Sequence, residues 1–319
     1  MLNPVFRPFV LLLALPGAAQ AGEVETWFGG AASGGVVVGD SGSGLGVAPT
    51  LAQAEVDARL GTDLLFIRVD LDVHMDPANL AGGITQPLPP EWAMLQIGRE
   101  QYHVRLGVTN PNIGLQQWDE WQNYLPSTSI LWAMQPAQII GAEPGMTIGA
   151  TDVFVYGGWD MAWQVMTGGA GFAVSQDSYY AALAVAAYPL QGTDYYSAFG
   201  CFEYYPLDQL YLSLDGGGGV IGGGAFAGGQ LQVVIIPEFV VSPTVRGEYL
   251  LDPGDVTGLP TSTAGAGLKI SPLEFISIGL EGKATFDTGA PQLSAIALLS
   301  VFRPEPDAYD ASYPVEEEE

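Results

Sequence analysis

Polar and apolar residues alternate in two neighbouring stretches of the chain, over residues 53–60 of 51–61 and residues 67–74 of 64–74. The polar positions are Gln53, Glu55, Asp57 and Arg59 in the first, and Arg68, Asp70, Asp72 and His74 in the second. A period of two predicts β-strands with one charged and one apolar face. A tilted strand needs about 9–11 residues to cross a bilayer, whereas strands of globular proteins average about five or six. These stretches are long enough to span a membrane.

Short turns alternate with longer connections along the whole chain. Short turn signals fall at 62–63, 99–100, 150–152, 176–178, 206–208, 237–238 and 271–274. Longer connections are expected at 40–50, 75–91, 110–136, 158–165, 190–193, 215–223, 251–259 and 288–291. Counting two strands for each short turn and one more at each end predicts sixteen strands. Fourteen is the alternative, because residues 92–98 and 209–214 are short for strands of this kind.

Short turns on one rim, with both termini there, and long connections on the other are typical of outer-membrane barrels. The sequence therefore predicts an all-β fold, a transmembrane antiparallel β-barrel of about sixteen strands over residues 22–303. A β-sandwich with buried aromatic residues is the alternative. Residues 1–21 read as a signal peptide, with Arg7, an apolar run and the small residues Ala19 and Ala21. Residues 304–319 are expected to be an acidic disordered tail.

Composition supports a barrel and excludes several classes of function. The chain is 48% hydrophobic, yet no stretch after the signal reaches the roughly 18 apolar residues of a membrane helix. It has 9 basic and 35 acidic residues, so removal of Arg7 with the signal leaves 8 − 35 = −27. Such a charge argues against nucleic acid as a partner. The single Cys201 excludes an internal disulfide and is expected to be a packing residue.

No cofactor or metal site is predicted, because no metal-ligand spacing accompanies His74 and His103. Residues 216–229 are rich in glycine but lack the Lys-Ser or Lys-Thr pair of a nucleotide-binding loop. This glycine tract is expected to be a flexible outer loop that leads into a strand.

The charged strand faces predict the lining of a water-filled lumen. The candidate pore-lining residues are Glu55, Asp57, Arg59, Arg68, Asp70, Asp72, His103, Arg105, Arg246, Glu248, Glu281 and Lys283. A two-residue turn at Thr62-Asp63 would place Asp57 opposite Arg68 and Glu55 opposite Asp70. Acidic residues outnumber basic ones in this set, which favours passage of cations. The alternative is that the charges only pair across strands and hold the wall in shape.

The longest connection, residues 110–136, is rich in aromatic residues that seldom sit in a freely solvated loop. It is expected to fold into the barrel mouth and narrow it, with Trp118, Asp119, Glu120 and Trp121 at the constriction. A packed external cap is the alternative.

Residues 91–160 resemble the second β-barrel porin family of Gram-negative outer membranes. The resemblance is carried by Val104–Gly107, Asn110–Gly114, Trp118-Asp119, Ser127–Ser129, Pro136 with Gly141, and Gly157–Asp160. Two positions depart from the family pattern: Gly158 replaces the usual Asn, and Gly107-Val108-Thr109 replaces Gly-Arg-Phe or Gly-Lys-Phe. The resemblance implies a passive or weakly selective channel and no catalytic residue.

We therefore expect a porin of the bacterial outer membrane, not an enzyme, that passes small hydrophilic solutes or ions and prefers cations. Its partners would be outer-membrane lipid, those solutes, and further copies of the chain in a homo-oligomer such as a trimer. A structural or adhesion barrel with a plugged lumen and ligand-binding loops is the main alternative. A phospholipase-type hydrolase ranks last, because His74 and His103 fall on the inward register.

Overall fold

The computed structural model describes most of the barrel wall and parts of the connections. The described residues are 24–40, 45–49, 52–62, 65–75, 92–99, 101–109, 124–127, 129–130, 139–161, 164–176, 178–190, 193–207, 209–235, 240–287 and 291–303. The predicted signal peptide and the predicted acidic tail lie outside them. Within these ranges no helix is long and apolar enough to cross a membrane.

All regular structure in the described residues is β-strand. The strands are β1 (Glu25–Asp40), β2 (Leu45–Pro49), β3 (Ala52–Thr62), β4 (Leu65–Met75), β5 (Trp92–Arg99), β6 (Tyr102–Thr109), β7 (Ile139–Ile148), β8 (Thr151–Asp160), β9 (Val165–Gln176), β10 (Tyr179–Leu190), β11 (Thr193–Leu207), β12 (Leu210–Ile221), β13 (Gly224–Ile235), β14 (Val241–Leu251), β15 (Ser262–Leu273), β16 (Ile276–Phe286) and β17 (Gln292–Phe302).

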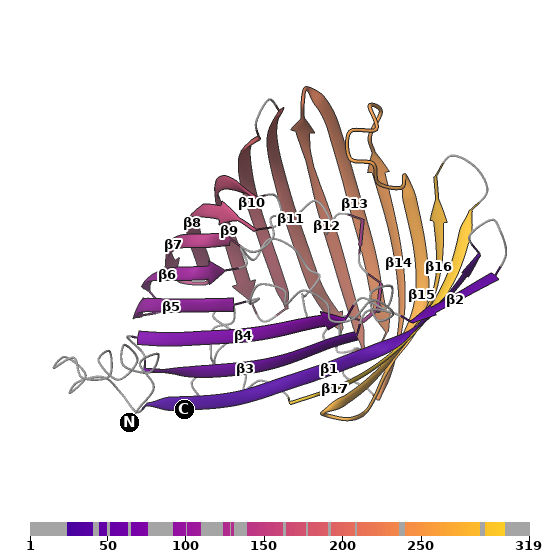
Figure 1. Ribbon diagram of the computed structural model, residues 1–319, viewed down its shortest axis with the longest axis horizontal. Coiled ribbons are helices and arrows are strands. Elements are labelled where there is room, and N and C mark those ends of the chain that lie inside the picture. The colour runs from indigo at the N-terminus through magenta and orange to yellow at the C-terminus, as the bar shows by residue number, and fades with distance from the viewer. Residues whose placement is uncertain are drawn as a thin grey trace.

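The strands pair antiparallel in sequence order and close on themselves through β1 (Figure 1). The first half of β1, Glu25–Ser33, pairs with β3, and Ala31–Gly39 pairs with β17. The short β2 pairs with Val36–Asp40 at the end of β1. Among the described residues, β1 and β3–β17 thus form a closed barrel of sixteen strands. The prediction of an all-β barrel with sixteen strands is confirmed, and the alternative of fourteen is wrong.

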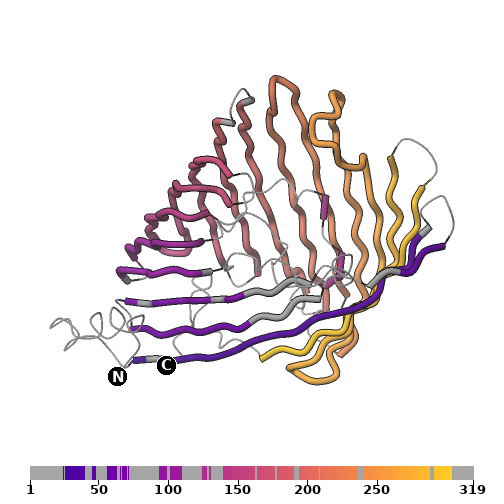
Figure 2. Tube along the Cα trace, in the orientation of Figure 1, coloured from indigo at the N-terminus to yellow at the C-terminus, as the bar shows by residue number. Residues whose placement is uncertain are grey.

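The two rims differ in the length of their connections, as predicted, and β1 begins on the same rim where β17 ends. The tube in Figure 2 shows neighbouring strands running side by side around the wall, joined at alternating ends. Two predicted long connections are shorter than expected, because β10 and β11 extend to Leu190 and Thr193 and β8 extends to Asp160. The connection expected at 215–223 is only the turn Gly222-Gly223, where both residues have positive φ.

The prediction that residues 216–229 form a flexible loop is wrong. Gly216–Gly219 lie in β12 and pair with β11 and β13. A methyl group at Gly217 would overlap the Phe199 ring of β11, and one at Gly219 would lie 3.0 Å from the Phe226 ring of β13. The glycines therefore give the aromatic rings of neighbouring strands space to lie flat against the wall.

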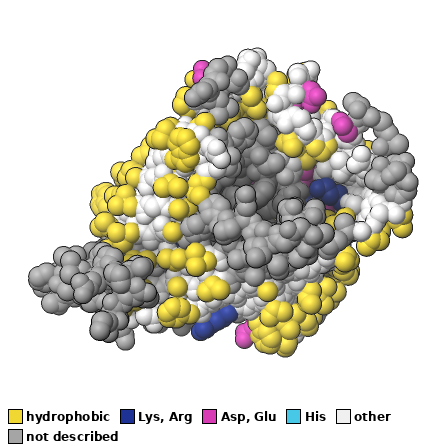
Figure 3. Space-filling view, in the orientation of Figure 1, with side chains coloured by type: hydrophobic (Ala, Val, Ile, Leu, Met, Phe, Trp, Pro, Cys, Tyr) yellow, Lys and Arg dark blue, Asp and Glu magenta, His cyan; other side chains and the backbone are white. Residues whose placement is uncertain are grey.

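The two faces of each strand differ sharply in polarity and exposure. Along β14, Val245 and Tyr249 are exposed, whereas Thr244, Arg246 and Glu248 are buried. Because the sheet is closed, the buried parity faces the interior and the exposed apolar parity faces outward. Figure 3 shows hydrophobic side chains gathered along the outside of the wall at the left and at the lower right of the view.

The fit between glycines and rings generates a stability prediction. Gly217→Ala should destabilise the barrel by about 1–3 kcal/mol, because a new methyl group must displace the Phe199 ring in a packed wall. Urea unfolding of the refolded protein measures the change. Gly247→Ala is the matched control, since a Cβ at this strand position meets no atom within 4 Å. Equal losses in both variants would contradict the role assigned to the ring.

Candidate functional site in the barrel interior

The structure places nine of the twelve predicted pore-lining residues on inward strand positions. These nine, whose side chains are described, are Asp57, Arg59, Arg68, His103, Arg105, Arg246, Glu248, Glu281 and Lys283. Six of these nine are buried: Asp57, Arg59, His103, Arg246, Glu248 and Glu281. The side chains of Glu55, Asp70 and Asp72 lie outside the described part, although the backbones of all three belong to β3 and β4.

The turn between β3 and β4 lies one residue later than predicted, so each residue of β3 has a different partner from the one predicted. The last pair before the turn is Thr62 with Leu65, so the connecting residues are 63–64 rather than 62–63. Arg59 therefore lies opposite Arg68, and Asp57 lies opposite Asp70. The predicted pairs of Asp57 with Arg68 and of Glu55 with Asp70 are therefore wrong, and like charges face each other in both observed pairs.

A buried ionic network joins β14 to β16. The Nε atom of Arg246 lies 2.8 Å from Oε1 of Glu248, and its Nη2 atom lies 3.5 Å from Oε1 of Glu281. All three side chains are almost completely buried. Each carboxylate also accepts hydrogen bonds from the connection that precedes β7, so the network links the wall to a segment inside the barrel.

That inward segment, residues 124–127 and 129–130, lies against the inner wall. The Ser127 amide and hydroxyl each donate to a different oxygen of Glu281 at 2.8 Å, and the amide of Ile130 donates to Glu248 Oε2 at 2.7 Å. Arg246 donates to the hydroxyl of Ser127. The described part of the longest connection therefore lies inside the barrel. The proposed constriction residues Trp118, Asp119, Glu120 and Trp121 lie outside the described residues.

Glycines in the wall form a recess for the inward segment. Leu125 is 1% exposed, and its side chain lies over Gly265 and Gly267 of β15. Pro126 lies over Gly279 of β16 in the same way. The neighbouring Tyr124 packs against Tyr211 of β12, with ring centroids 5.6 Å apart, and the Lys269 ammonium lies 5.3 Å from its ring centroid.

A second ion pair lies on the opposite part of the wall. Nη1 of Arg105 donates to Oε1 of Glu143 at 2.8 Å, and its Nε donates to Gln96 at 3.1 Å. His103 is buried two positions away, against Gly145 of β7. Glu143 was missed by the sequence analysis, although alternation in β7 would have placed it on the inward face.

Two further inward acids that are fully buried were missed, Asp160 and Asp215, which are 0% and 2% exposed. Asp160 is the last residue of β8 and was assigned to a loop. Asp215 was assigned to the start of the glycine connection, but it belongs to β12 and pairs with Gln230. Extending the alternation through those segments would have found both acids.

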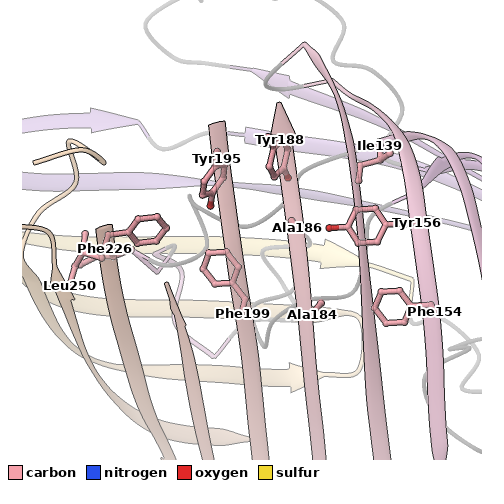
Figure 4. Close-up of a cluster of buried hydrophobic side chains, with 11 residues drawn as sticks. Ile139, Phe154, Tyr156, Ala184, Ala186, Tyr188, Tyr195, Phe199, Phe226 and Leu250 are labelled. Atoms are coloured by element: carbon pink, nitrogen blue, oxygen red, sulfur yellow. The ribbon is translucent and has the colours of Figure 1, made fainter. Parts of the chain in front are cut away.

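Aromatic residues form a buried cluster inside one sector of the barrel, over β7–β14 (Figure 4). The members of this inner aromatic cluster are Ile130, Ile139, Phe154, Tyr156, Ala184, Ala186, Tyr188, Tyr195, Phe199, Phe226 and Leu250. Tyr188 and Tyr195 stack with centroids 5.1 Å apart and planes inclined by 17°. Ile130 of the inward segment packs into the cluster, which anchors that segment to a second part of the wall.

The connection between β14 and β15, residues 252–261, also packs onto the inner aromatic cluster, through Val256 and Leu259. The Asp252 carboxylate accepts hydrogen bonds from the amides of Val256 and Thr257 and from the Thr257 hydroxyl, at 2.7–2.9 Å. Desolvation raises the pKa of Asp252, but the hydrogen bonds from Thr257, Val256 and Gly254 outweigh it and hold the pKa below its ordinary value. The ionised carboxylate therefore stabilises the folded connection.

Possible metal ligands do not cluster among the described side chains. These side chains contain no group of three or more His, Cys, Asp or Glu residues placed to hold a metal ion. Cys201 is a free, buried residue of β11, where it packs as a small apolar side chain. The chemistry of this interior is therefore that of a charged and aromatic surface.

Comparison with solved structures identifies bacterial outer-membrane porins as similar folds. A loop-deletion mutant of OmpT, an outer membrane protein of Vibrio cholerae, matches with TM-score 0.64 and 9% identity, over 88% of this chain and 99% of that one. A triple mutant of the Rhodopseudomonas blastica porin matches with TM-score 0.61 and 12% identity, over 88% and 100% of the two chains. At such identities the likeness establishes the fold alone.

No family model and no curated protein matches the chain. The resemblance of residues 91–160 to one particular porin family therefore stays a prediction.

The ionic network predicts a large stability effect. Glu281→Gln should destabilise the barrel by about 3 kcal/mol, because Arg246 loses one of two buried carboxylate partners. Urea unfolding followed by tryptophan fluorescence measures the loss. Glu274→Gln, at an exposed position in the turn before β16, is the matched control and should change stability little. Similar stability of the two variants would show that the network contributes nothing.

The Asp252 hydrogen bonds predict a pH-dependent connection. Its lowered pKa means that the stabilisation is complete above the ordinary pKa of aspartate and is lost as pH falls through the lowered value. At pH 7, Asp252→Asn should make the amides of Val256 and Thr257 exchange with deuterium several-fold faster, because a neutral amide is a weaker acceptor. Asp255→Asn, at an exposed position in the same connection, is the control. Equal exchange in the two variants would refute the assignment.

Proposed function

We propose that this protein is a porin of the bacterial outer membrane that passes small hydrophilic solutes or ions by passive diffusion, without a catalytic step. The observation that carries the proposal is the closed sixteen-stranded wall, apolar outside and rich in buried polar groups inside. An apolar outer surface can contact lipid tails without exposing polar groups to them. A closed barrel also leaves no unpaired strand edge in the bilayer. Barrels of sixteen to eighteen strands are wide enough to hold an aqueous channel.

We further propose that the lumen prefers cations. The described inward positions carry acids at Asp57, Glu143, Asp152, Asp160, Glu203, Asp215, Glu248 and Glu281, and bases at Arg59, Arg68, Arg105, Arg246, Lys269 and Lys283. The excess of acids is small among these residues. Glu55, Asp70 and Asp72, which alternate with apolar residues in β3 and β4, would enlarge it. A lumen with a net negative wall concentrates cations and repels anions.

The inward segment would set the narrowest part of the lumen. Ser127 and Ile130 hold it to Glu281 and Glu248, and Leu125 fits the glycine recess. In this proposal Trp118, Asp119, Glu120 and Trp121 of the same connection reach into the remaining space. A homo-oligomer such as a trimer, in outer-membrane lipid, completes the proposed assembly.

A second candidate function is supported by the packing of the interior. The inward segment and the inner aromatic cluster fill part of the barrel, as expected of a structural or adhesion barrel with a plugged lumen. Liposome swelling separates the two candidates. A porin equilibrates small sugars across the vesicle membrane, whereas a plugged barrel leaves the vesicles osmotically intact.

The cation preference is tested by reversal potentials in a KCl gradient across planar bilayers. Wild-type channels should favour K⁺ over Cl⁻, and the Asp119→Asn, Glu120→Gln double variant should bring the permeability ratio closer to one, because two charges leave the constriction. Asp255→Asn, which removes one exposed charge at the rim, should leave the ratio nearly unchanged. Anion preference in the wild-type protein would refute the charge assignment.

A further inference from the structure

A half-buried acid lies beside tyrosine rings at the short-turn end of the barrel interior. Glu203 shares the inward face of β11 with Phe199 and Cys201, close to the short turn that joins β11 to β12. The Tyr211 hydroxyl of β12 lies within hydrogen-bonding reach of its carboxylate. None of the ion pairs among the described residues includes Glu203. A carboxylate that is partly removed from water attracts a cation more strongly than an exposed one, because the local dielectric constant is lower.

Three tyrosine rings form a contiguous group next to this acid. The ring centroid of Tyr211 lies 4.9 Å from that of Tyr205 and 5.6 Å from that of Tyr124. Tyr211 is 5% exposed and forms the base of the group, whereas Tyr205 is 40% exposed and leaves its ring accessible at the short-turn mouth. Tyr205 and Glu203 are two residues apart on one strand, which corresponds to about 7 Å along β11. An ammonium group in contact with the Tyr205 ring is therefore close to the carboxylate.

The chain itself shows an ammonium group against a ring of this group. The Lys269 ammonium lies 5.3 Å from the ring centroid of Tyr124. A cation over the face of an aromatic ring is attracted by the quadrupole of the ring. Lys269 belongs to β15, and β12, β13 and β14 separate that strand from β11. Its charge therefore lies at the Tyr124 end of the group, whereas Glu203 lies beside the Tyr205 end.

We propose that Glu203 and Tyr205, with Tyr211 behind them, bind an organic ammonium cation at the short-turn end of the barrel interior. The carboxylate pairs with the charge, and the rings contact the carbon atoms around the nitrogen, as in the aromatic cages that recognise quaternary ammonium ligands. A metal ion fits less well, because Ca²⁺ takes about six to eight oxygen ligands. The proposal rests on the proposed function where it assigns a class of solute to the channel, but the binding step requires no conduction.

Calorimetric titration of the refolded full-length chain with choline tests the site. A polyoxyethylene detergent is suitable, because it carries neither an ammonium group nor a sugar. The expected result is saturable binding of one choline per chain. Dimethylbutanol, the neutral carbon isostere of choline, should bind at least about tenfold more weakly, because it has the same shape without the charge. This comparison uses the wild-type protein alone, so it does not depend on the refolding of a variant.

Substitutions assign the binding to the named side chains. Glu203→Gln and Tyr205→Leu should each weaken choline binding about tenfold, whereas Tyr205→Phe keeps the ring and should retain the affinity. Tyr204→Leu is the matched control for the ring, because Tyr204 lies on the outward face of β11 and stacks with Phe202. Glu274→Gln, at an exposed turn position, is the control for the acid. Both control variants should bind choline as the wild type does.

Conductance in planar bilayers separates this site from the porin function. Choline should reduce the K⁺ current of wild-type channels more than that of Glu203→Gln channels, because bound choline occupies part of the passage. Choline binding to a chain that forms no channel would leave the site standing and refute the porin function alone. Three results would overturn the site: conducting channels in a protein without saturable choline binding, equal affinity for choline and dimethylbutanol, or wild-type affinity in both Glu203→Gln and Tyr205→Leu.

Discussion

The need of every backbone N–H and C=O group for a partner is the constraint on which this structure depends. In a bilayer, the location proposed for this protein, those partners must come from neighbouring strands, so the sheet has to close. β1 provides the closure by pairing with β3 along its first half and with β17 along its second. Once the ring is closed, every strand has one face toward the interior. The alternation along each strand then sorts the side chains into an apolar outer surface and a polar, aromatic interior.

The interior is more crowded than a simple water-filled tube. The inward segment is held by charged groups at Glu281 and Glu248 and by apolar packing at Ile130. The glycines of β12 and β15 make this crowding possible, because they let rings and the Leu125 side chain approach the wall closely. A passage for solute would therefore be smaller than the strand number alone suggests, and its lining would include residues from the connections.

Charge is distributed unevenly around this interior. In β14–β16 the ionic groups satisfy one another and the inward segment, so their contribution is mainly structural. Between β3 and β4 the register brings like charges together and leaves Asp57 buried without a hydrogen bond to Oδ1.

Alternation and turn spacing were sufficient to predict the class of fold, the number of strands and the inward parity of residues such as Arg246 and Glu281. These features depend on local periodicity, which a single sequence displays directly. The glycine tract at 216–219 was misread because glycine has no side chain to alternate, and its role depends on rings of neighbouring strands.

What the tertiary structure alone decided was which residues meet across strands and across the lumen. The pairing of Asp57 with Asp70 depends on where one tight turn begins, because moving that turn by one residue changes the partner of Asp57 from Arg68 to Asp70. The contact of Ser127 with Glu281 joins residues 154 positions apart. Local sequence determines the face on which a side chain lies, whereas register and closure, which involve the whole chain, determine its partners.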